Sequence, residues 1–310
     1  MRNFLLCFLA SPVIADQFPV SRCVNFDQAL EAPKEGDWGY TISYEDIVWI
    51  ADQGFDTIRL PVKFSAHWDD ALSPEILARV DQVIGWAFSQ ELQVILDLHH
   101  FDEILTDPDK HADMFFDIWA ELSTHYARYD HRLIFELLNE PSENLKTPRA
   151  VSLFESVYPT IRSDHPDRWI IIEGAEWAEI SALQDLPLID DKTALSFHYY
   201  SPYTFTHQLA EFHVDPMPAA TWGDRSERQV LRDDIALAAS RDVPLLLGEF
   251  GVTSPTKLSE RINWITSVRK EAESHGIGWC HWGFARGFAI YDEETGDWLP
   301  GMEQALMSKR

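Results

Sequence analysis

Short apolar segments alternate with amphipathic segments along the whole chain, and this alternation restricts the fold more than any other feature. Apolar runs of this length fit strands that are buried on both faces, as in parallel sheets. Eight strands are predicted, at residues 22–26, 57–60, 94–98, 133–138, 169–173, 194–198, 245–249 and 278–282.

Segments with helical spacing of apolar residues separate these strands. Ser43 followed by Asp46 is close to a capping box, and Ser73 before Pro74 favours the start of a helix. Helices are predicted at 43–52, 73–90, 113–126, 148–164, 177–186, 226–241, 259–274 and 301–309. This order predicts one α/β domain, a (β/α)8 barrel of the TIM type, and the length of 310 residues fits a single barrel.

The charge of the chain excludes several classes of partner. It has 25 basic and 51 acidic residues, a net charge of −26. Nucleic acids and anionic membranes would be repelled, whereas a neutral polysaccharide would not. The sequence has no glycine-rich phosphate loop, so no nucleotide cofactor is expected.

The N-terminus resembles an export signal. Arg2 supplies a positive charge, residues 4–10 are apolar, and residues 13–15 offer small side chains before a cleavage point. We predict a signal peptide at residues 1–15, a catalytic domain at 16–310, and a secreted or periplasmic protein. The apolar stretch is too short to span a bilayer, so no membrane anchorage is expected.

Removal of a signal peptide would leave two cysteines, Cys23 and Cys280. Free buried cysteines are the first expectation for two such residues. A disulfide is the alternative, because an exported protein can form one and the first and last strands of a barrel are neighbours.

Polar or aromatic side chains stand at the end of each predicted strand. They are Asn25, Arg59, His99 and His100, Asn139 and Glu140, Glu173, His198 to Tyr200, Glu249 and Trp282. One or two polar strand ends would be ordinary caps. A set of this size at the rim where barrel enzymes carry their active sites predicts a site.

Glu140 and Glu249 are suited to the cleavage of glycosidic bonds, which needs one protonated and one ionised carboxyl group. Glu249 is predicted to be the ionised group, held as an anion by Arg59 and the Tyr200 hydroxyl. Glu140 is predicted to be the acid, kept protonated by the neighbouring negative charge.

The remaining rim residues are predicted to bind or support the substrate. The Asn139 amide suits a sugar 2-hydroxyl, and Trp282 offers a stacking face. His99 and His100 would point to opposite sides of an extended segment, so one is expected at the substrate and the other in a structural role. No metal-binding His pattern is present, and no metal is expected.

Three acids near the rim are expected to be supports rather than catalysts. Glu136 lies inside the fourth strand and is expected to pair with Arg59. Asp97 alternates with apolar residues and is expected to be a buried hydrogen-bonded support. Glu173 closes the fifth strand without a paired motif, so it is expected to be structural.

Five segments resemble glycoside hydrolase family 5 in their residues and in their order. They are Asp-Thr-Ile-Arg-Leu-Pro at 56–61, Asp-Leu-His-His at 97–100, Leu-Leu-Asn-Glu-Pro at 137–141, His-Tyr-Tyr at 198–200 and Gly-Glu-Phe-Gly at 248–251. The resemblance implies a retaining double displacement, with Glu140 as acid/base and Glu249 as nucleophile.

Two further segments resemble the endo-β-1,4-glucanase branch of that family. Residues 29–39 resemble the loop after the first strand in bacterial cellulases, and residues 205–208 resemble a subgroup active on both glucan and mannan. The resemblance implies that His207 lines the site. It also implies a β-1,4-linked polysaccharide or oligosaccharide as substrate, no cofactor, and a monomer.

Three departures from the branch leave the polysaccharide open. The chain has Asp27-Gln28 in place of Gly-Asn, Cys23 in place of Gly, and Phe212 in place of Trp. β-1,4-Mannan, glucomannan and xyloglucan therefore remain candidates beside glucan. A non-catalytic carbohydrate-binding barrel and a metal-dependent hydrolase are further hypotheses, against which the intact rim residues argue.

Overall fold

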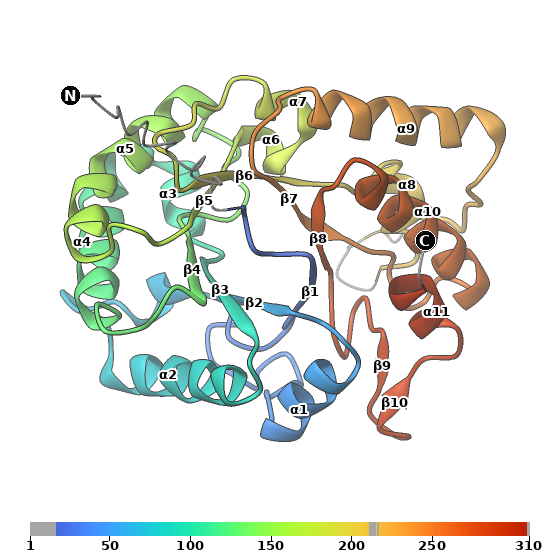
Figure 1. Cartoon of the computed structure of the whole chain (residues 1–310), viewed down its shortest axis with the longest axis horizontal. Helices are drawn as coiled ribbons and strands as arrows, with labels where there is room; N and C mark the ends of the chain where they lie inside the picture. The colour runs from blue at the N-terminus through green and yellow to red at the C-terminus, as the bar shows by residue number, and fades with distance from the viewer. Residues whose placement is uncertain (1–16, 211–214, 216, 309–310) are drawn as a thin grey trace, which may run out of the picture.

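Eight parallel strands close into a barrel at the centre of the molecule (Figure 1). The computed structural model describes residues 17–210, 215 and 217–308, so the predicted signal peptide and Phe212 lie outside the described residues. The strands are β1 Arg22–Asn25, β2 Thr57–Val62, β3 Gln93–Leu98, β4 Leu133–Glu136, β5 Ile170–Glu173, β6 Thr193–His198, β7 Leu245–Phe250 and β8 Gly278–His281. Each strand pairs with the next and β1 also pairs with β8, which confirms the predicted (β/α)8 barrel.

Helices surround this barrel (Figure 1). They are α1 Tyr44–Asp52, α2 Pro74–Ser89, α3 Asp102–Thr106, α4 Pro108–His125, α5 Thr147–Asp164, α6 Ala175–Ala178, α7 Ile180–Leu183, α8 Tyr203–Thr206, α9 Arg225–Ala239, α10 Leu258–Ser274 and α11 Met302–Met307. Among these helices, none has both the length and the apolar composition that a membrane span requires.

The predicted helix starts at Ser43 and Ser73 are confirmed. Ser43 and Asp46 form a reciprocal capping box, in which each side chain accepts a hydrogen bond from the other residue's N–H. The Ser73 hydroxyl accepts the Ile76 N–H, and Pro74 occupies the first helical position.

Two predicted helices differ from the structure. The helix predicted at 113–126 begins earlier, at Pro108, because the Asp107 side chain caps it through the Lys110 N–H. The helix predicted at 177–186 is instead the two short turns α6 and α7. Its first residues have left-handed backbones, including Trp177 with φ 57°.

The elements that the sequence analysis missed are all short. They are α3, α8, a 3₁₀ turn at Phe64–His67, and a hairpin of β9 Tyr291–Asp292 with β10 Asp297–Trp298. None is long enough to display a periodic pattern of apolar residues.

The inside of the barrel begins with an apolar layer, here called the lower layer. It consists of Cys23, Ile95, Ile134, Ile171, Ala194, Leu246 and Cys280. A separate, larger apolar core lies between the strands and the helices.

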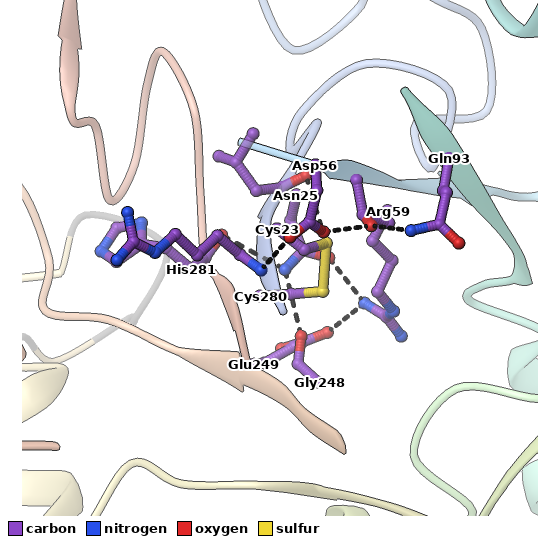
Figure 2. The surroundings of a disulfide bond; sticks show 12 residues. Cys23, Asn25, Asp56, Arg59, Gln93, Gly248, Glu249, Cys280 and His281 are labelled. Atoms are coloured by element: carbon purple, nitrogen blue, oxygen red, sulfur yellow. Dashed lines mark hydrogen bonds and ion pairs between the residues drawn. A yellow bond between two sulfur atoms is a disulfide. The ribbon is translucent and has the colours of Figure 1, made fainter. Parts of the chain in front are cut away.

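A disulfide joins Cys23 and Cys280 within the lower layer (Figure 2). The first expectation, two free buried cysteines, is therefore wrong. Closure of the barrel pairs Cys23 with Cys280 across β1 and β8, with their Cα atoms 4.1 Å apart. The sequence could not reveal this register.

Candidate active site

A cleft of about 1260 Å³ opens where the strands end. Of the predicted site residues, eight line it: His99, His100, Glu140, His198, Tyr200, His207, Glu249 and Trp282. The other three, Asn25, Arg59 and Asn139, lie buried behind this wall. The structure thus brings all eleven to one end of the barrel.

Arg59 is the centre of a buried polar layer that lies directly above the lower layer. Its Nε and Nη2 donate to the two Glu136 oxygens at 2.7 and 2.9 Å, which confirms the predicted pairing. Its Nη2 also lies 3.0 Å from Asp97 Oδ2, which is 2.5 Å from His99 Nδ1. We call this buried layer around Arg59 the upper layer. It consists of Asn25, Arg59, Asp97, Glu136, Glu173, Ser196 and Gly248.

Glu249 receives two hydrogen bonds that suit a carboxylate anion. Arg59 Nη1 donates to Oε1 at 2.8 Å, and the Tyr200 hydroxyl donates to Oε2 at 2.9 Å. Arg59 Nη1 also donates to Asn25 Oδ1, which joins β1 to the same network (Figure 2). Burial, with a smaller contribution from the carboxylates of Glu140 and Glu173, raises the pKa of Glu249 above its usual value. The positive charges of His198 and Arg59 offset this rise only in part.

Glu140 lies in a different environment from Glu249. Its backbone is left-handed, with φ 46°, and its N–H donates to Glu173 Oε2 at 2.8 Å. Its side chain is 25% exposed, against 6% for Glu249, so Glu140 meets the open cleft. The two carboxyl groups are therefore unequal, one reaching into the cleft and one held in a charged wall.

His198 links the two glutamates. Its Nδ1 lies 2.7 Å from Glu140 Oε1 and 3.6 Å from Glu249 Oε2, and its Nε2 lies 2.8 Å from Glu173 Oε1. Burial lowers the pKa of His198, but the carboxylates of Glu173 and Glu249 outweigh it and raise that pKa well above its usual value. Glu173 is thus a support for both His198 and Glu140, as expected from the sequence.

One ligand atom each from Glu140, His198 and Glu249 lies within 4.8 Å of the others. Such a group could hold a metal ion. Both Glu249 oxygens, however, already accept hydrogen bonds from Arg59 and Tyr200, and Glu140 already contacts His198. The arrangement also brings two carboxyl groups close enough to act on one bond.

The rings of the predicted site residues Trp282 and His207 line the same cleft as the two carboxyl groups. Trp282 stacks on His99, with ring centroids 5.6 Å apart and an angle of 10°. His207 stacks on Tyr203 at 3.9 Å. His99 and His100 both line the cleft, against the expectation that one would be purely structural, because the left-handed φ of 49° at His100 ends the strand alternation.

Three exposed aromatic residues of the cleft were not predicted as site residues. They are Trp38, Trp177 and Tyr203, which are 43%, 55% and 50% exposed. Trp38 lies in the loop after β1, Trp177 in the short turn α6 and Tyr203 at the start of α8. Large exposed rings of this kind are suited to sugar faces. A Trp in a loop carries no sequence signal that separates it from a core Trp, so these residues could not be assigned.

The comparisons with known proteins agree with this geometry. The family model described as Cellulase (glycosyl hydrolase family 5) matches residues 16–286. The chain belongs to glycosyl hydrolase family 5. This confirms the resemblance and the enzyme class that it implies, a glycoside hydrolase of the cellulase type.

Curated relatives in family 5 are longer than this chain. Endoglucanase H of Acetivibrio thermocellus is 27% identical over 92% of the chain, which covers 33% of that relative. Endoglucanase 3 of Fibrobacter succinogenes is 26% identical over 93% of the chain, which covers 52% of it. The chain therefore spans about a third to a half of the length of these family members.

Solved structures in family 5 match the whole barrel. A hyperthermophilic endo-beta-1,4-glucanase in complex with substrate is 34% identical, with a TM-score of 0.90, over 94% of this chain and 97% of that one. Cel5A of Thermotoga maritima in complex with mannotriose is 32% identical, with a TM-score of 0.89, over 93% of this chain and 97% of that one.

Proposed function

We propose that the chain is a secreted, retaining endo-β-1,4-glucanase in which Glu249 is the nucleophile and Glu140 the acid/base. One observation carries this proposal: oxygens of the two carboxyl groups lie within 4.8 Å of each other at the cleft. Carboxyl groups about 5–5.5 Å apart act in retaining enzymes, whereas inverting enzymes need about 6.5–9.5 Å to admit a water.

In the first step, Glu249 attacks the anomeric carbon while Glu140 gives its proton to the leaving oxygen. Arg59 and the Tyr200 hydroxyl hold Glu249 as an anion and fix its direction of attack. In the second step, Glu140 removes a proton from a water molecule whose oxygen attacks the anomeric carbon. The new bond to this oxygen replaces the bond to Glu249, which leaves as a carboxylate. His198, 2.7 Å from Glu140 Oε1, orients the acid/base in both steps.

The proposed substrate is a β-1,4-glucan, cut internally. Aromatic rings line the cleft of about 1260 Å³, and the solved endo-beta-1,4-glucanase complex supports this choice by analogy. A β-1,4-mannan or glucomannan is the second candidate, favoured by the mannotriose complex of the Thermotoga maritima protein.

Secretion is supported by two independent features. The N-terminal residues have the pattern of a signal peptide, and the disulfide between Cys23 and Cys280 suits an oxidising compartment. We expect the secreted protein to be a monomer, which sedimentation analysis would test.

Release of reducing ends tests the reaction. The purified protein should release them from carboxymethylcellulose, with a rapid fall in viscosity that marks internal cleavage. Parallel assays on mannan, glucomannan and xyloglucan rank the candidates. No release from any β-1,4-glucan would refute the proposed substrate.

Two controls separate a metal-dependent hydrolase and an inverting enzyme from the proposed one. Activity that survives EDTA would refute a metal-dependent hydrolase, whereas loss with EDTA and recovery with a divalent cation would support one. Proton NMR of the first product should show the β anomer, because a retaining enzyme keeps the configuration of the bond that it cleaves. The α anomer as first product would contradict the retaining mechanism.

A further inference from the structure

The loop after β1 departs from the branch pattern at two neighbouring residues, and both pack against glycines of the segment after β8. A Cβ built on Gly283 would overlap the Asp27 carboxyl, and one built on Gly287 would lie 2.6 Å from Gln28 Nε2. Neither glycine has a left-handed φ. The missing side chains at 283 and 287 therefore make room for Asp27 and Gln28, and neither glycine is needed for a left-handed backbone.

Asp27 is anchored to this segment through the backbone. It is 1% exposed, and its Oδ1 accepts the Phe284 N–H at 2.8 Å. Glu31 fixes the loop on the other side by accepting the N–H groups of Gln28 and Ala29. The Asp27 carboxyl thus connects the loop after β1 to the chain immediately after Trp282.

The segment after β8 carries two rings of the cleft wall, Trp282 and Phe288. Trp282 directly precedes Gly283, and Phe288 directly follows Gly287. Phe288 contacts the rings of Tyr200 and His207, with centroids 6.0 and 5.4 Å apart. The path of residues 282–288 therefore decides where both rings meet the substrate.

The buried carboxyl group of Asp27 costs stability, so packing alone does not explain an acid at this position. Asp27 Oδ2 is buried without a hydrogen-bond partner, and burying an unpaired polar group costs stability. Burial raises the pKa of Asp27 to about 7, while the Phe284 N–H acts in the opposite direction. An apolar side chain would fill the same space without this cost, but it could not bind the Phe284 N–H.

We propose that Asp27, paired with Gly283, is a positioning residue that sets where Trp282 lies in the cleft and so how tightly the enzyme holds its substrate. The inference rests on the proposed function only in taking a sugar unit as the ligand of Trp282.

Four variants test this pairing: Asp27→Asn, Asp27→Gly, Gly283→Ala, and the double variant Asp27→Gly with Gly283→Ala. Asp27→Gly should raise KM for cellopentaose roughly three- to tenfold, with a smaller change in kcat, because it misplaces a stacking face. Asp27→Asn keeps an oxygen acceptor for Phe284, so KM should stay within about twofold of the parent value.

Thermal unfolding supplies a readout that does not depend on activity. Gly283→Ala should lower the Tm by roughly 5 °C, because its methyl group overlaps Asp27. In the Asp27→Gly background, Gly283→Ala should lower the Tm by less than about half of that amount, because the Asp27 carboxyl group that its methyl group would overlap is gone.

Three results would overturn the inference. The first is an additive loss of Tm in the double variant, which would mean that positions 27 and 283 are not coupled. The second is an unchanged KM in Asp27→Gly, and the third is an Asp27→Asn variant as impaired as Asp27→Gly. If the parent protein cleaves no β-1,4-glucan, the proposed function fails by itself, and the Tm coupling still decides whether the two positions are paired.

Discussion

On six of the barrel strands, β1 and β3 to β7, the lower and upper layers lie two residues apart. The lower residues are apolar, whereas the upper ones are polar except for Gly248. On β3, β4 and β5 the lower layer has Ile95, Ile134 and Ile171, and the upper layer has Asp97, Glu136 and Glu173. On β1 the change is from Cys23 to Asn25. A single step of the strand alternation separates a dry core from a layer of buried charge.

The two layers are also held together by different forces. Burial of apolar area stabilises the lower layer, together with a covalent link between the first and last strands. In the upper layer each charge is costly by itself and is tolerated only because Arg59 and His198 pair with the acids. We infer that the lower layer serves stability and the upper layer serves chemistry.

The largest expected effect comes from removing the charge of Glu249, which the upper layer holds at the cleft. Glu249→Gln should lower kcat on cellopentaose by at least about 10⁴-fold, because the nucleophile is lost. Its Tm should stay close to that of the parent. Glu75→Gln, at an exposed position in the first turn of α2, is the matched control and should keep full activity. Substantial activity in Glu249→Gln would contradict the assignment of Glu249 as the nucleophile.

Two fully buried arginines allow a comparison between the upper layer and the outer helices. Arg59→Met should lower the free energy of unfolding by about 3–5 kcal/mol and abolish hydrolysis, because it removes the guanidinium group that pairs with the buried carboxylates of Asp97, Glu136 and Glu249. Arg269→Met, in α10, should also cost stability but should keep kcat, because Arg269 hydrogen bonds to Ala305, Glu273 and Ser308, none of which lines the cleft. Unfolding in guanidinium chloride measures the stability of the two variants, and steady-state kinetics measure their kcat. Equal losses of kcat in the two variants would show that activity depends on stability alone.

In the lower layer, loss of the disulfide should affect stability and not catalysis. The double variant Cys23→Ala with Cys280→Ala should lose about 2–4 kcal/mol of unfolding free energy, because the bond closes a loop with a sequence separation of 257. Its kcat and KM should match the parent at 25 °C. Dithiothreitol should destabilise the parent and leave the variant unaffected. A fall in kcat would mean that the lower layer also shapes the site.

The smallest expected effect is the pH dependence of stability that comes from Asp27. This residue lies two positions after Asn25, the upper-layer residue of β1. Burial raises its pKa in the folded protein to about 7, from 3.8, so folding favours the protonated form. Its contribution to stability is full below pH 3.8 and is lost as the pH rises through 7. The groups that act on its charge are Glu249, Glu31 and Tyr40.

Asp27→Asn should remove this pH dependence. Between pH 5 and pH 8, the Tm of the parent should fall relative to that of Asp27→Asn by roughly 5 °C. Differential scanning calorimetry at each pH measures the difference. A constant difference across this range would show that Asp27 does not titrate there.

The sequence predicted the barrel and much of the site because both depend on local patterns. Each strand was a short apolar run, and Asn139, Glu140 and Glu249 stood at strand ends where a barrel collects its chemistry. Two partners of Arg59, Glu136 and Glu249, were predicted from charge, since a buried cation needs acids beside it.

The rest of the site depends on three-dimensional contacts that no local pattern encodes. Trp38 and Trp177 face the cleft only because of the paths of their loops, and three consecutive left-handed residues place Trp177. The pairing of Asp27 with Gly283 joins residues from opposite ends of the chain, so it became visible only after the barrel closed.

Chemical trapping of the nucleophile tests the central claim most directly, namely that the upper layer holds Glu249 as an anion that attacks the sugar. The protein would be incubated with a 2-deoxy-2-fluoro-β-cellobioside carrying a good leaving group and then analysed by intact-mass and peptide mass spectrometry. The account predicts one added fluorocellobiosyl group, bound to the peptide that contains Glu249, and no adduct in Glu249→Gln. An adduct on another residue, or steady turnover of an unfluorinated substrate with no adduct on Glu249, would contradict it.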